Sequence, residues 1–123
     1  MKKDIARITI NKKMTIRETM SVINNATRCG FPPGIALLIE NKKLIGVVTD
    51  GDIRRALDSA ENIKSIKAKN IMTPNPKTTK PNALMTEAEE LMHLNKISSL
   101  IVTDDNEKLL GILQLHNIDI IYK

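Results

Sequence analysis

The sequence predicts a mixed α/β (α+β) fold built from two related β-α-β-β-α units. Two observations support this prediction. Apolar residues with helical spacing recur after 68 residues, and each half contains two short apolar runs joined by a polar turn. A repeat of this kind indicates two copies of one supersecondary unit. The repeated helical positions are Ile16, Met20 and Ile23 in the first half and Leu84, Ala88 and Leu91 in the second.

The apolar runs predict the central strands of each unit. Residues 35–40 (IALLIE) and 99–103 (SLIVT) are rich in consecutive, rather than alternating, apolar residues. Strands with this pattern are buried on both faces, so we expect helices to cover the sheet. The turns at 40–43 and 104–108 contain Asn and Asp, which favour the tight turns of hairpins.

Two glycines align the copies beyond the turns. Gly46 and Gly111 are 65 residues apart, three fewer than the offset between the helical positions. The first copy has therefore gained three residues, which we assign to the loop 29–33 (CGFPP).

A helix is expected directly after the last strand of the first unit. Thr49, Asp50 and Asp52 carry side chains that satisfy the free amide groups at the start of a helix. We assign the first unit to residues 5–65 and the second to residues 66–123. Because half-units of about 60 residues cannot each bury a sheet alone, we expect them to pack as one body with pseudo-two-fold symmetry.

Composition excludes several classes of protein. No stretch of roughly 18 apolar residues is present and the N-terminus lacks the apolar core of a signal peptide, so we expect a cytoplasmic chain with no membrane partner. The net charge of +5 is mild, and Phe31 and Tyr122 are the only aromatic residues, so we expect no nucleic-acid partner. The single Cys29 excludes a disulfide framework and a Cys-rich zinc site.

The sequence offers no catalytic or metal-binding constellation. The two histidines, His93 and His116, lie in different predicted elements, and neither has further ligands at metal-binding spacing. An acidic pair such as Asp50 and Asp52 can hold a metal in a nucleotidyltransferase, but this chain is too short for that catalytic fold. We therefore expect no catalytic residues, no metal site, no required cofactor and no enzymatic activity.

Several of these residues resemble the signature of CBS (cystathionine beta-synthase) domains. Gly46, Thr49 and Asp52 have the signature's spacing at a strand-to-helix junction. Segment 71–76 (IMTPNP) resembles the proline-flanked entry of such domains, and the tandem arrangement also matches. The string 48–55 (VTDGDIRR) is similar to the CBS pairs attached to sugar-phosphate nucleotidyltransferases and to arabinose-5-phosphate isomerases. The start of the chain favours the nucleotidyltransferases, whereas the second copy favours the isomerases, so both classes stay open.

The resemblance implies a tandem CBS pair that binds AMP, ADP, ATP or another nucleotide in a cleft between the copies. It also implies regulation of an attached or partner sugar-phosphate enzyme. CBS pairs usually form homodimers through their helices, and a two-fold dimer is the commonest assembly. Met20, Ala88 and Met92 are the apolar helix residues that we expect at such a dimer face.

The residues around the first motif have the chemistry that a nucleotide requires. A carboxylate at Asp52 accepts hydrogen bonds from ribose hydroxyls, and the hydroxyl of Thr49 with the amides of a helix start binds phosphate. Arg54 and Arg55 add guanidinium groups, whose forked N–H donors suit phosphate oxygens. The base would lie along the backbone near Ile35 and Ala36. The nucleotide-binding candidates are Thr49, Asp50, Asp52, Arg54, Arg55, Ile35, Ala36, Gln114 and Asn117.

The second copy departs from the pattern, because Gln114 and Asn117 stand where the family has a hydroxyl and an acid. An amide accepts from ribose more weakly than a carboxylate does, so we expect unequal occupancy of two sites. An alternative hypothesis is a structural dimerisation module whose ligand sites have decayed. Thr49 and Asp52 would then act only as helix caps, which needs no ligand.

Overall fold

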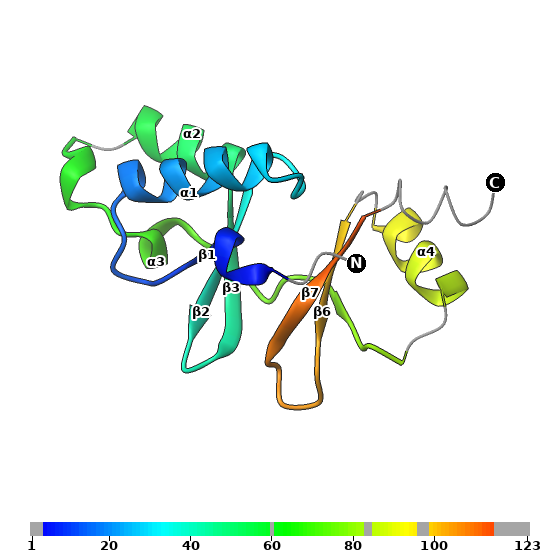
Figure 1. Cartoon of the computed structure of the whole chain (residues 1–123). Coiled ribbons are helices and arrows are strands. Elements are labelled where there is room, and N and C mark those ends of the chain that lie inside the picture. The colour runs from blue at the N-terminus through cyan, green and yellow to red at the C-terminus, as the bar shows by residue number, and fades with distance from the viewer. Residues whose placement is uncertain (1–3, 60, 83–84, 96–98, 115–123) are drawn as a thin grey trace. The chain divides into compact units, whose positions relative to one another are not determined.

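The computed structural model of the chain describes residues 4–59, 61–82, 85–95 and 99–114 (Figure 1). The chain divides into two compact units, one of residues Ala6–Pro76 and one of Met1–Ile5 with Lys77–Lys123. Each unit contains a small β-sheet and at least one helix, so the predicted mixed α+β class is confirmed. The boundary that we assigned at residues 65 and 66 stays a prediction.

The unit of residues 6–76 is built on a sheet with strand order β1-β2-β3-β4. Strand β1 runs parallel to β2, and the other neighbours are antiparallel. The elements in chain order are η1 (Ile5–Ile8), β1 (Thr9–Ile10), α1 (Ile16–Arg28), β2 (Ile35–Glu40), β3 (Lys43–Thr49), α2 (Asp50–Ser59), η2 (Ile63–Ser65), α3 (Ala68–Ile71) and β4 (Thr73–Pro74).

Helix α1 begins at a complete capping box. Thr15 accepts a hydrogen bond from the Glu18 backbone N–H through its hydroxyl (3.1 Å), and the Glu18 carboxylate accepts one from the Thr15 N–H (3.2 Å). These two bonds satisfy amide groups that have no partner within the helix. The helix buries Ile16 and Ile23, as the apolar spacing predicted, whereas Met20, the third position of that spacing, is 41% exposed.

Strand β2 is buried on both faces, as its consecutive apolar residues predicted. Ala36, Leu37 and Leu38 are all fully buried, and successive side chains of a strand point to opposite faces. One face packs in a core with α1 and α2, which lie beside each other along the sheet (Figure 1). The buried core residues are Ile10, Ile16, Ile23, Ala36, Leu38, Val48, Ile53, Ala56 and Ala68.

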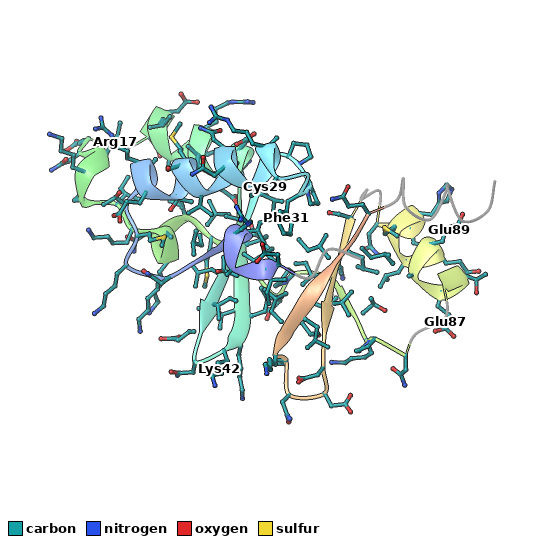
Figure 2. All side chains as sticks on the ribbon, in the orientation of Figure 1. Arg17, Cys29, Phe31, Lys42, Glu87 and Glu89 are labelled. Carbon is teal, nitrogen blue, oxygen red and sulfur yellow. The ribbon has the colours of Figure 1, made fainter. Side chains whose placement is uncertain are left out.

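The hairpin between β2 and β3 closes at residues 41 and 42. Asn41 and Lys42 both have positive φ angles (52° and 68°), as the central residues of a type I′ turn do. Lys42 lies at this tip, visible at the end of the hairpin in Figure 2. The predicted polar turn is therefore confirmed.

The second unit contains a sheet of strand order β5-β6-β7 within the described residues. Strand β5 is parallel to β6, and β6 is antiparallel to β7. Glu87 and Glu89 lie on the single helix described in this unit (Figure 2). The elements are β5 (Thr78–Thr79), α4 (Met85–Leu94), β6 (Ser99–Thr103) and β7 (Leu109–Gln114).

The two hairpins share an irregularity that supports the repeat. Gly46 pairs with Leu38, and Gly111 pairs with Val102. The register shifts directly after each of these pairs, which leaves one extra residue immediately before each glycine. The glycines that aligned the copies in sequence therefore occupy equivalent places in the two hairpins.

The proposed dimer face needs a correction. Ala88 and Met92 are 3% and 1% exposed, and they pack with Leu100 in the core of their unit. They were expected on the surface because helical spacing identifies an apolar face without saying what covers it. Met20 is 41% exposed, as expected.

No helix in the described part of the chain is both long and apolar enough to cross a membrane. The repeat position Leu84 and the residue His116 lie outside the described residues.

Candidate functional site

The candidate site lies where β3 ends and α2 begins. The Asp52 N–H donates to the Thr49 hydroxyl (3.2 Å), and the Thr49 N–H donates to the Asp52 carboxylate (2.9 Å). This reciprocal pair is equivalent to a capping box, with Asp52 in the place that Glu usually takes. The two residues are thus brought together as predicted, and they cap the helix as the alternative hypothesis expected.

The Asp52 carboxylate is buried and accepts from three different groups. The residue is only 6% exposed. Besides the Thr49 N–H, one oxygen accepts from the Arg55 guanidinium at 2.6 Å. The hydroxyl of Thr73, in β4, lies 3.2 Å from both carboxylate oxygens. A buried carboxylate held by a cation and two hydrogen-bond donors is fixed in orientation.

Arg55 and Arg54 both lie exposed on the first turns of α2. The Arg55 side chain is 73% exposed although it is paired with Asp52. A Cβ atom placed on Gly51 would lie 3.4 Å from Arg55 Nη1 and 3.6 Å from the Thr49 hydroxyl oxygen. The guanidinium therefore extends along the helix start, beside the hydroxyl that was predicted to bind phosphate.

The start of β2 forms the neighbouring edge of the site. Ile35 pairs with Thr49 in the sheet, and the Asp50 N–H donates to the Gly34 carbonyl (3.0 Å). Gly34 has a positive φ of 72°, and a Cβ atom there would lie 2.7 Å from the Asp50 carboxylate. Only glycine therefore fits at position 34, beside the Asp50 carboxylate, without strain. Ile35 is half-buried, whereas the side chain of Ala36 is fully buried in the core and offers no surface to a ligand.

The candidates of the second copy belong to the other unit. Gln114 ends β7, pairs with Ser99 and is 6% exposed. Asn117 lies outside the described residues. Within the described residues, no group of three His, Cys, Asp or Glu side chains is arranged to hold a metal ion.

A family model describing the CBS domain matches residues 1–59 and residues 68–119. This chain is a tandem CBS domain pair. The two matched segments correspond to the two copies of the repeat, and the junction of β3 and α2 lies in the first.

Curated relatives of this CBS pair include arabinose 5-phosphate isomerases. A probable arabinose 5-phosphate isomerase of Haemophilus influenzae is 40% identical over 82 residues, which are 66% of this chain and 24% of the relative. The isomerase KdsD of Salmonella typhimurium is 32% identical over 110 residues, which are 89% of this chain and 32% of the relative. The chain thus spans a quarter to a third of their length. Of the two enzyme classes that the sequence resembled, these relatives support the isomerases.

Solved structures share the fold of the pair. The cytosolic domain of the Mg²⁺ channel MgtE, determined in complex with ATP, has a TM-score of 0.78 and is 19% identical. It covers 93% of this chain, and the match spans 44% of that one. The CBS domain protein PAE2072 from Pyrobaculum aerophilum, determined with AMP, has a TM-score of 0.70 at 24% identity, over 89% of this chain and 81% of that one.

Sequence reasoning missed one member of the site in the CBS pair. Thr73 follows Met72 in the IMTPNP segment, 21 residues from the carboxylate that it contacts. The sequence indicates that this segment is a proline-flanked entry to the second unit, yet no periodicity or spacing connects it to Asp52. Only the antiparallel pairing of β4 with β3, in which Thr73 lies opposite Val47, brings it there.

Proposed function

We propose that this CBS pair is a regulatory module that senses a nucleotide and acts on a sugar-phosphate isomerase. The observation that carries the proposal is the buried Asp52 carboxylate, fixed at the start of α2 in a chain of this family. The isomerase assignment rests on the curated relatives, and the adenosine nucleotide on the AMP and ATP named for structures of the same fold.

The ligand would use the groups that surround this carboxylate. The ribose hydroxyls would donate to Asp52, and the phosphates would approach the Thr49 hydroxyl and the first amides of α2. The exposed guanidinium groups of Arg54 and Arg55 would neutralise phosphate charge. The base would lie along the start of β2, where Ile35 offers the half-buried apolar side chain.

The module would regulate without catalysing. The proposal assigns no catalytic group, metal or required cofactor to this chain, and its partners are a nucleotide and the sugar-phosphate enzyme. Ligand binding would change the activity of that enzyme rather than supply chemistry to it.

Thermal unfolding with AMP, ADP, ATP, CMP and nucleotide sugars tests the proposal. A ligand that binds only the folded protein raises its melting temperature progressively as the concentration exceeds the dissociation constant. We expect at least one adenosine nucleotide to do so, and we expect Asp52→Ala to abolish or weaken the shift. If none of these ligands raises the melting temperature, the sensing function is wrong.

A second candidate function is a structural dimerisation module. It is favoured by the reciprocal Thr49–Asp52 cap, which satisfies both residues without any ligand. The same thermal screen separates the two functions, because a purely structural module would not respond to nucleotides at any concentration.

Both functions are compatible with a homodimer, which we propose on a revised face. Met20, Leu57 and Ile63 are each about 40% exposed and line one groove formed by α1, α2 and η2. Large apolar side chains grouped on one surface commonly mark an interface. None of the candidate nucleotide-binding residues lines this groove, so dimerisation there would leave them accessible.

A further inference from the structure

The Asp52 carboxylate has little capacity left for a ligand. One oxygen accepts from the Thr49 N–H, the other from Arg55, and the hydroxyl of Thr73 lies 3.2 Å from both. Each carboxylate oxygen has about two acceptor positions, so these donors occupy most of the group. The residue is also only 6% exposed. Three donors leave about one of the four acceptor positions, so a ribose that donates both of its hydroxyls to this carboxylate must displace one of the present donors.

Two of the three donors belong to α2 or to its cap. The Thr49 N–H belongs to the last residue of β3 and forms one half of the helix cap, so losing it would disturb the start of α2. The Arg55 guanidinium forms a charge-assisted bond of 2.6 Å within the same helix. Its side chain is 73% exposed, so water weakens this pair, but a short charge-assisted bond still exceeds a long bond between neutral groups.

Thr73 is the weakest donor of the three. Its single hydroxyl hydrogen is shared between two acceptors, both at 3.2 Å, which is long for an O–H donor. Thr73 is exposed and lies in a strand of two residues at the edge of the sheet. Its neighbour in that strand, Pro74, has no N–H to contribute to the pairing with β3.

We propose that Thr73 fastens β4 to Asp52 in the ligand-free protein and that the ribose of a bound nucleotide displaces it. This inference rests on the proposed function. The displaced segment continues through Asn75 and Pro76 to Lys77, where the other unit resumes. Occupancy of the site is thereby transmitted to one of the two places where the chain passes from one unit to the other.

Calorimetric titration of Thr73→Val with AMP, ADP and ATP tests the displacement of Thr73 by ribose. Valine has the shape of threonine without the hydroxyl, so the competing donor is removed while β4 is retained. We expect nucleotide affinity to rise about two- to tenfold, the equivalent of one ordinary hydrogen bond. The control is Thr79→Val, the same change in the two-residue strand β5, which should leave affinity unchanged.

Nucleotide affinity that is unchanged or reduced in Thr73→Val would overturn the proposed displacement. If Thr73 only positioned Asp52, its hydroxyl would help the ligand to bind, and removing it would not raise the affinity. Wild-type protein that binds none of the three nucleotides would overturn the proposed function as well, so the two failures are distinguishable.

Hydrogen exchange of the wild-type protein gives a second readout that needs no substitution. We expect the amides of Thr73 and Asn75 to exchange faster when the nucleotide is bound, although ligands usually slow exchange near their sites. Slower exchange in this segment would contradict the release of β4.

Discussion

The backbone of Gly46 lies so close to Met72 that a Cβ atom at position 46 would fall 2.6 Å from the methionine sulfur. The same atom would lie 3.0 Å from the Thr73 carbonyl oxygen. Because position 46 has no side chain, β4 can pair beside β3 there. This pairing places Thr73 next to Asp52. The glycine of the family signature thus has a packing role at this position.

Gly46→Ala should destabilise the protein by about 1–3 kcal/mol, because a methyl group without space displaces its neighbours. Urea unfolding measures the change. Gly51→Ala is the matched control, because a Cβ atom there meets nothing closer than 3.4 Å and the position is helical. We expect that control to be neutral or up to about 1 kcal/mol stabilising. Equal losses in both variants would contradict the packing argument.

Asp52→Ala should weaken nucleotide binding about ten- to a hundredfold, because it removes charge-assisted hydrogen bonds worth roughly 1.5–3 kcal/mol. Calorimetry with the best-binding nucleotide measures the loss. Thr15→Ala removes the equivalent cap of α1 and controls for loss of helix stability. Asn117→Ala should weaken nucleotide binding much less. If Asn117→Ala weakens binding more than Asp52→Ala does, the two sites have been assigned to the wrong copies.

Protein stability should fall in acid partly through Glu18. Hydrogen bonds from Thr15, first from its backbone N–H and then from its side chain, hold the pKa of the Glu18 carboxyl below its ordinary value of 4.5. The carboxylate therefore stabilises the fold fully above the unfolded pKa, and this contribution is lost as pH falls through the lower, folded pKa.

Glu18→Gln keeps an acceptor for the cap and removes the titration. The variant should be less stable than the wild type at neutral pH, and the two unfolding midpoints should converge as the pH falls from the ordinary pKa of 4.5 through the lower pKa of the folded protein. Chemical unfolding as a function of pH measures this difference. Curves that stay parallel through the acid range would show that the Glu18 charge does not contribute.

Met20→Glu should convert a dimer to a monomer, because it places a charge in the groove lined by Met20, Leu57 and Ile63. Sedimentation at micromolar concentration measures the mass. Leu94→Glu, at an 81% exposed residue of the other unit, is the control and should leave the dimer intact. A monomeric wild type, or a dimer lost only in the control variant, would refute this face.

Local signals predicted the regular elements closely. Strands β2 and β6 have the bounds that their apolar runs indicated, and α2 begins directly after Thr49. Such elements depend on neighbouring residues and were therefore visible in the sequence. Helix α3 was not predicted, because its four residues are too few for periodicity. Its first N–H donates to the Met14 carbonyl (2.8 Å), a contact between distant segments.

The site was predicted in part for the same reason. The Thr49–Asp52 pair is local and its spacing identified it, both as a family motif and as a cap. The contribution of Thr73 depends on strand pairing, and the burial of Ala36 depends on how the helices cover the sheet. Sequence spacing carries neither kind of information.

The extra residue in each hairpin has a consequence for the direction of the strand that follows it. Ile45 and Leu110 interrupt the pairing at the same place, directly before Gly46 and Gly111. A bulge bends its strand and increases the local right-handed twist. In both copies the strand therefore reaches its polar end residue, Thr49 or Gln114, three residues beyond the glycine of the same bend. The two hairpins thus present chemically different strand ends with one shared backbone geometry.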